Sequence, residues 1–154
     1  MRWLAIDHGL KHVGVAVGDM VTRQAGPLER ISGQEEDNLI ARIDALAQEY
    51  GVDGIVVGWP LNADGTEGPQ GRLARQFAAR LAQRTGRDVR MWDERLSSFV
   101  ADQRLRGRFT RKKKKQRQDA VAAASFLEDF LARDGPTAAP RPESAVPPEP
   151  HEAE

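Results

Sequence analysis

Residues 3–17 read Trp-Leu-Ala-Ile-Asp-His-Gly-Leu-Lys-His-Val-Gly-Val-Ala-Val, and this stretch indicates how the fold begins. Residues 3–6 form an apolar run that ends at Asp7, and Gly9 then introduces a turn. Residues 12–17 are rich in β-branched side chains, which favour strands. The pattern therefore predicts an antiparallel hairpin.

The rest of the chain alternates between helical and strand patterns. Strands are predicted over residues 26–31, 53–58 and 88–92, and helices over residues 34–50, 69–85, 96–105 and 116–133. In the helix that begins at Pro69, the spacing of Leu73, Phe77 and Leu81 predicts the buried stripe. A hairpin start gives antiparallel pairing, and strand–helix alternation gives parallel additions. The predicted fold class is α/β, with a mixed five-stranded sheet of three antiparallel strands followed by parallel additions, and helices on both faces.

Composition divides the 154 residues into a folded domain over residues 1–133 and a disordered tail over residues 134–154. The tail holds six of the nine prolines among Ala and Glu, so it cannot bury enough apolar area to offset its chain entropy. The absence of cysteine excludes disulfides, thiolate metal sites and a cysteine nucleophile. No apolar run approaches the ~20 residues of a membrane span, so we expect a soluble cytoplasmic protein without membrane contact.

Charge is distributed unevenly along the chain. The totals are 23 basic and 23 acidic residues, but the tail contributes one arginine and five acids. The remaining chain therefore carries 22 basic and 18 acidic residues, a net charge of +4. Residues 104–117 hold nine basic residues and no acid. Such a block indicates a polyanionic partner such as nucleic acid, or alternatively a merely solvated surface.

Three carboxylates are candidates for catalysis. Asp7 ends the first strand and Glu94 follows strand 88–92, and ligands of α/β sheets bind at the carboxyl ends of strands. Asp119 shares a helical stripe with Ala123 that must face the sheet, so this carboxylate needs a cation, donors or water. If the three side chains converge, their oxygen ligands suit Mg²⁺ or Mn²⁺.

Each carboxylate also has a purely structural interpretation. Asp7 can cap a turn, Glu94 can cap the following helix or pair with Arg95, and Asp119 can interact with the helix dipole. The loop over residues 59–68 leads into a helix N-terminus that can hold a phosphate, or it is an ordinary connector. A histidine zinc site is disfavoured because the three histidines lack metal-ligand spacing.

Four motifs follow one another along the chain. They are the stretch over residues 6–17, then Val57-Gly-Trp-Pro-Leu-Asn with Asp64-Gly-Thr-Glu-Gly-Pro-Gln, then Asp93-Glu-Arg-Leu-Ser-Ser, and last the lysine run with Asp119-x-x-Ala-Ala. Together they resemble the bacterial YqgF/RuvX family over nearly all of residues 1–133. Members are described as pre-16S rRNA nucleases and, earlier, as Holliday-junction resolvases. The resemblance implies a ribonuclease-H-like fold.

The resemblance also implies roles for individual residues. Asp7, Glu94 and Asp119 would be catalytic and would bind metal, with two divalent ions assisting phosphodiester hydrolysis. The residues expected to bind nucleic acid are Lys11, His12, Asn62, Arg95, Ser97, Lys112, Lys113, Lys114 and Lys115. His12 stands where the family usually has arginine, which puts one phosphate contact in question.

Three functions are compatible with these features. The first is hydrolysis of phosphodiester bonds in processing the 5′ end of pre-16S ribosomal RNA, and the second is resolution of Holliday junctions. The third is a non-catalytic nucleic-acid-binding or ribosome-assembly factor, which would have no use for three acids facing phosphate. No sequence feature marks a dimer helix, so we expect a monomer or a weak homodimer.

Overall fold

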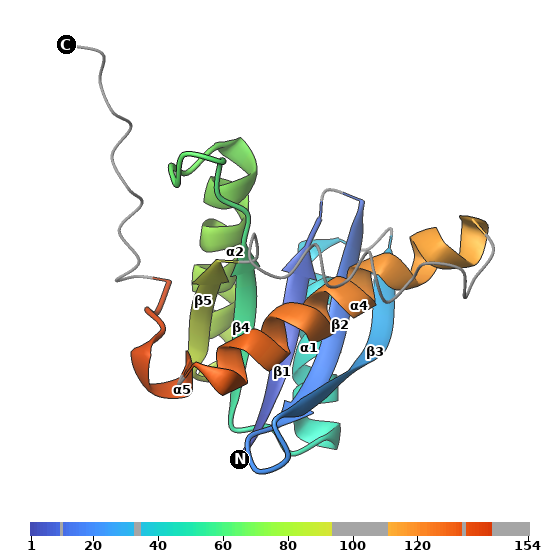
Figure 1. The fold of residues 1–154 in the computed structure, drawn as a ribbon, viewed down its shortest axis with the longest axis vertical. Coiled ribbons are helices and arrows are strands. Elements are labelled where there is room, and N and C mark those ends of the chain that lie inside the picture. Colours follow the sequence, from blue (N-terminus) through green and yellow to red (C-terminus); the bar gives the residue numbers. More distant parts are fainter. Residues whose placement is uncertain (10, 33–34, 94–110, 134, 143–154) are drawn as a thin grey trace.

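The computed structural model describes residues 1–9, 11–32, 35–93, 111–133 and 135–142, and at positions 111–119 it describes the backbone only. The strands are β1 (Arg2–His8), β2 (His12–Asp19), β3 (Gln24–Ser32), β4 (Gly54–Trp59) and β5 (Val89–Asp93). They form one sheet in the order β3-β2-β1-β4-β5 (Figure 1). The pairs β1–β2 and β2–β3 are antiparallel, whereas β1–β4 and β4–β5 are parallel. The predicted mixed five-stranded sheet is therefore confirmed.

Helices cover both faces of this sheet, as predicted (Figure 1). They are α1 (Glu36–Glu49), α2 (Pro69–Thr85), α4 (Arg111–Ala132) and the short α5 (Gly135–Ala138). Alternation along β1 explains the two faces, because successive side chains of a strand point to opposite sides. Leu4 and Ile6 lie in the core beneath α1 and α2, and Trp3 and Ala5 lie in the core beneath α4. No helix among the described residues is long and apolar enough to cross a membrane.

Two details of the helices differ from the sequence expectations. Helix α4 begins at Arg111, five residues before the predicted start at Gln116. Leu73 was expected in the buried stripe of α2 but is 42% exposed, whereas its neighbour Ala74 is fully buried. The buried stripe of α2 therefore includes Ala74 in place of Leu73. Packing against the sheet sets the rotation of the helix about its own axis. The helix predicted over residues 96–105 lies outside the described residues.

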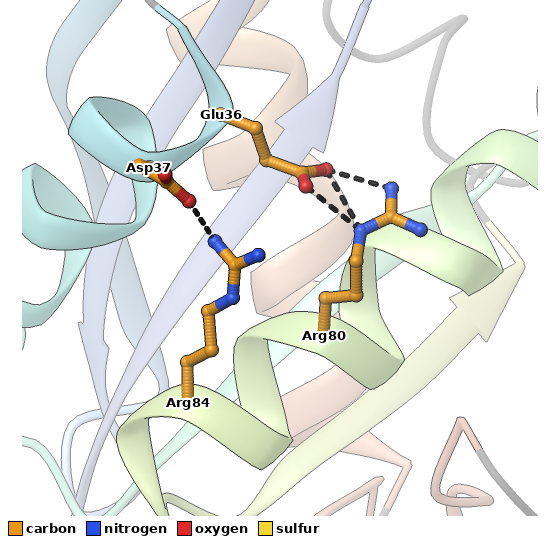
Figure 2. A network of polar contacts seen from close by, with 4 residues as sticks. All are labelled: Glu36, Asp37, Arg80 and Arg84. Carbon is orange, nitrogen blue, oxygen red and sulfur yellow. Dashed lines mark hydrogen bonds and ion pairs between the residues drawn. The ribbon is translucent and has the colours of Figure 1, made fainter.

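Three ion pairs join α1 to α2. Arg80 binds Glu36 through both carboxylate oxygens, and Arg84 binds Asp37 one turn further along α2 (Figure 2). Arg87, just beyond α2, binds Asp44 at 2.7 Å. All six side chains are partly exposed, so each pair contributes only about 0.2–1 kcal/mol. Three acidic side chains of α1 are therefore paired with arginines of α2 or of the residues just after it.

The chain beyond α4 packs against the edge strand β5. The carbonyl of Pro140 accepts a hydrogen bond from the Met91 N–H at 2.8 Å, and the Ala139 carbonyl accepts one from Arg90 at 2.8 Å. Ala139 is 3% exposed. The predicted disordered tail over residues 134–154 therefore needs a correction at its start, since residues 135–142 belong to the folded part. Residues 143–154 lie outside the described residues.

Candidate active site at the carboxyl-terminal edge of the sheet

The ends of three strands meet at one edge of the sheet. Because β1, β4 and β5 are mutually parallel, their carboxyl-terminal ends lie at the same edge of the sheet (Figure 1). These ends carry Asp7, Trp59 and Asp93. The β1–β2 turn with Lys11 lies there too. Ligands of α/β proteins bind at such an edge.

Asp7 is flanked by glycines on both neighbouring strands. Its partner on β2 is Gly14. On β4, Gly58 follows Val57, the partner of Ile6, so Gly58 lies beside Asp7 in the same register. Asp7 shares the face of Ala5, which lies beneath α4. Both glycines are buried, and neither carries a side chain, so no side chain of β2 or β4 flanks Asp7 in this row of the sheet.

The two other predicted carboxylates are placed only in part. Asp119 belongs to α4, one turn before Ala123, which packs in the core that contains Ala5. The side chain of Asp119 lies outside the described part of the chain. Glu94 also lies outside it, as do Arg95, Ser97 and the side chains of the lysine run at 112–115. Within the described residues no group of three acidic or histidine side chains forms a metal-ligand cluster.

The end of strand β5, directly before Glu94, packs against helix α4. The Trp92 indole N–H donates to the Asp129 carboxylate at 2.9 Å. Its ring meets Phe130 edge-on, with centroids 5.5 Å apart. Since Trp92 packs on the α4 face, the strand that leads to Glu94 is fixed against the same helix that carries Asp119. The sequence did not reveal this contact.

Three of the residues predicted to bind nucleic acid lie at this edge, and their surroundings differ: Lys11, His12 and Asn62. Lys11 is exposed in the β1–β2 turn. His12 begins β2, and its Nδ1 is buried without a hydrogen-bond partner among the described residues. The Asn62 side-chain amide donates to the Thr66 hydroxyl at 3.0 Å, so it also holds its own loop together.

The loop that follows β4 is built around a buried carboxylate, which sequence reasoning missed. The Glu67 side chain is 5% exposed and accepts hydrogen bonds from the Trp59 indole and from Arg75, at 2.9–3.0 Å. Burial opposes ionisation of Glu67, but the hydrogen bonds from Arg75 and Trp59 outweigh it and lower its pKa. The Glu67 carboxylate thus ties the end of β4 to the first turns of α2.

We expect Glu67→Gln to destabilise the fold by roughly 1–3 kcal/mol, because it leaves Arg75 without its buried counter-charge. Since the folded-state pKa of Glu67 is lowered, its contribution is fully present above the unfolded value of about 4.3 and fades as the pH falls below it. Urea unfolding at pH 7 and at pH 3.5 measures both effects. Glu29→Gln is the matched control, because the exposed Glu29–Arg42 pair should contribute less than about 1 kcal/mol. Equal losses in the two variants at pH 7 would contradict the assignment.

His8 occupies the opposite face of the sheet from Asp7. Its ring stacks on Phe77 of α2, with centroids 4.3 Å apart and planes inclined by 14°. Burial lowers the pKa of His8, while the nearby Glu36 carboxylate raises it and Arg80 lowers it, with a net downward direction. His8 therefore anchors the end of β1 to α2 rather than facing the Asp7 side.

A mixed five-stranded sheet with helices on both faces, and with Asp7 one residue before the end of its central strand, is an α/β fold of the ribonuclease-H-like class. The family model described as "RuvX: Holliday junction resolvase" matches residues 1–133, and the chain belongs to this family. Curated relatives named "Putative pre-16S rRNA nuclease" support the assignment. The one from Anaeromyxobacter dehalogenans (strain 2CP-1 / ATCC BAA-258) is 44% identical over 137 residues, covering 88% of this chain and all of the relative. The one from Bacillus cereus (strain B4264) is 45% identical over 136 residues, covering 86% and 99%.

Solved structures confirm the fold. The structure titled "T. thermophilus RuvC in complex with Holliday junction substrate" matches with a TM-score of 0.59 and 19% identity, covering 91% of this chain and 99% of that one. A Fowlpox virus resolvase in complex with Holliday junction DNA matches with a TM-score of 0.52 and 12% identity, covering 86% and 98%. At these identities the likeness concerns the fold alone.

Proposed function

We propose that this protein is a metal-dependent nuclease that processes the 5′ end of pre-16S ribosomal RNA. The observation that carries the proposal is the position of Asp7, at the carboxyl end of the central strand between two glycines. A carboxylate at the carboxyl-terminal edge of a sheet, with no side chain beside it on either neighbouring strand, suits a bound cation and the phosphate it attracts. The name of the curated relatives supports ribosomal RNA as the substrate.

Asp7, Glu94 and Asp119 would hold the ions. A set made only of carboxylate oxygens fits Mg²⁺ or Mn²⁺, and neither Gly14 nor Gly58 places a side chain beside Asp7. Bound divalent ions would supply an activated water and charge stabilisation for the leaving oxygen. The positions of Trp92 and Ala123 support this grouping. Trp92 lies two residues before Glu94 and Ala123 lies one helical turn after Asp119, and both pack in the core on the Asp7 face of the sheet.

Basic residues would hold the backbone of the nucleic acid. Lys11 lies at the edge beside Asp7, and Arg95 directly follows Glu94 in the chain. The lysines at 112–115 lie in the first turns of α4, the helix that crosses the Asp7 face of the sheet (Figure 1). Contacts of this kind position a strand without reading its sequence.

Neutralising the four lysines at 112–115 to glutamine should weaken binding to all nucleic acids alike. The slope of log K against log salt should fall by about 0.7–0.9 for each phosphate that the variant no longer neutralises. Fluorescence anisotropy with labelled RNA and DNA over a series of KCl concentrations measures this slope. Arg23→Gln, in the turn that precedes β3, is the control and should leave the slope unchanged. An unchanged slope in the quadruple variant would mean that the run is a solvated surface.

Resolution of branched DNA is the second candidate, and the description of the family model favours it. A resolvase normally needs two active sites in a dimer, whereas we propose a monomer or a weak homodimer. Cleavage of a ribosomal RNA precursor and of a four-way DNA junction, assayed side by side with and without Mg²⁺, decides between them. Cleavage of neither substrate with Mg²⁺ would favour a non-catalytic binding factor.

A further inference from the structure

Strand β3 places an arginine in the same row of the sheet as Asp7. Asp7 pairs with Gly14, and Gly14 pairs with Arg30. Residues directly opposite each other on neighbouring strands point to the same face, so Asp7 and Arg30 share one face across an intervening glycine. Two strand spacings separate their Cα atoms by about 10 Å.

The neighbours of Arg30 identify that face independently. Glu29 binds Arg42 of α1 at 2.6 Å, and Ile31 lies in the core beneath α1. Both flanking side chains therefore point toward α1, and Arg30 points to the opposite face, the one that α4 and Asp7 share.

Arg30 differs from most arginines of the described chain in having no ion pair there. Each of four others binds a carboxylate: Arg42, Arg75, Arg80 and Arg84. Arg30 is half-buried and is the single lysine or arginine in β2 and β3. A half-buried cation without a described counter-charge is suited to an anionic ligand.

We propose that Arg30 binds a phosphate of the nucleic acid strand that lies along the Asp7 face, an inference that rests on the proposed nuclease function. A guanidinium binds phosphate through two parallel hydrogen bonds, which fixes orientation as well as position. Gly14 stands between Arg30 and Asp7 in this row and carries no side chain, so no side chain of the sheet separates a phosphate held by Arg30 from the carboxylate. Arg30 is thus a substrate-positioning residue contributed by the strand farthest from β5.

Arg30→Gln and Arg30→Lys test this proposal, with Arg23→Gln, in the turn that precedes β3, as the matched control. Binding of a labelled single-stranded RNA and of a DNA four-way junction is measured by anisotropy in EDTA over a series of KCl concentrations. Arg30→Gln should weaken binding roughly tenfold and lower the salt slope by about 0.7–0.9. Arg30→Lys should keep the slope, because its charge remains, and bind with intermediate affinity. Arg23→Gln should behave like the wild type.

Several outcomes would overturn the proposal. Wild-type affinity and slope in Arg30→Gln would do so, and so would an equal loss in Arg23→Gln, which would indicate a general charge effect. A loss in Arg30→Lys equal to that in Arg30→Gln, together with a lowered melting temperature in both, would show a structural role. If the wild type binds but cleaves neither substrate, the nuclease function fails while the binding data still decide the role of Arg30.

Discussion

Asp7→Asn should reduce cleavage of the protein's substrate by at least about 10³-fold, which corresponds to about 4 kcal/mol of transition-state stabilisation. An amide keeps the size of the carboxylate but loses its charge and one anionic oxygen, so the site would lose the ligand at the end of the central strand. Single-turnover cleavage with saturating Mg²⁺ measures the effect on the chemical step. Binding in EDTA should stay equal or become tighter, because a negative charge beside the phosphate is removed.

Asp19→Asn is the matched control for this experiment. Asp19 ends β2 at the opposite edge of the sheet, where it pairs with Arg2 in the β1–β2 register. The control should cleave at the wild-type rate. Full activity in Asp7→Asn, or an equal loss in Asp19→Asn, would contradict the assignment of the site.

Truncation after Arg133 should lower stability by roughly 2–4 kcal/mol and the melting temperature by roughly 5–12 °C. The deletion removes the buried Ala139 and leaves the Met91 N–H and the Arg90 side chain without their carbonyl partners. It also uncovers Phe130, because residue 135 lies so close to this ring that a Cβ there would overlap it. Calorimetry measures the change. From composition alone the same deletion is expected to leave the melting temperature nearly unchanged, and the structure corrects that expectation.

Truncation after Pro142 is the control, since it removes the acidic end of the chain but keeps the contacts with β5. It should melt like the full chain. If both truncations melt alike, the contacts of Ala139 and Pro140 with β5 contribute nothing to stability.

Local patterns were sufficient for much of the architecture. Residues 3–17 predict the hairpin because an apolar run, a turn and a β-branched run are each short-range features. The central position of Asp7 follows from the same stretch, since a strand that pairs first with its hairpin partner can then accept a parallel neighbour. The positions of Glu94 after a strand and Asp119 on a helical stripe could be predicted in the same way, although their side chains lie outside the described residues.

Other features depend on partners far away in the sequence. The rotation of α2 is decided by the sheet beneath it, so Leu73 is exposed although its spacing from Phe77 fits a buried stripe. The proline-rich composition of the tail indicates disorder, but proline keeps its carbonyl, and the Pro140 carbonyl accepts a hydrogen bond from the edge of β5. In the sequence Glu67 has no feature that marks it as buried. Its role follows from the fold, which brings Trp59 and Arg75 to its carboxylate.

Arg30 shows most clearly what sequence periodicity cannot supply. Counting alternate residues from Ala25, which faces α4, would place Arg30 on the α1 face. A register shift in the β2–β3 pairing pairs Val15 with Glu29 but Ala16 with Pro27, so one extra residue of β3 reverses the alternation. A bulge of one residue moves every later side chain to the other face, and it is set by the pairing of whole strands. The sequence alone therefore determined the strands and helices and the place of Asp7, whereas only the tertiary structure decided that Arg30 shares its face.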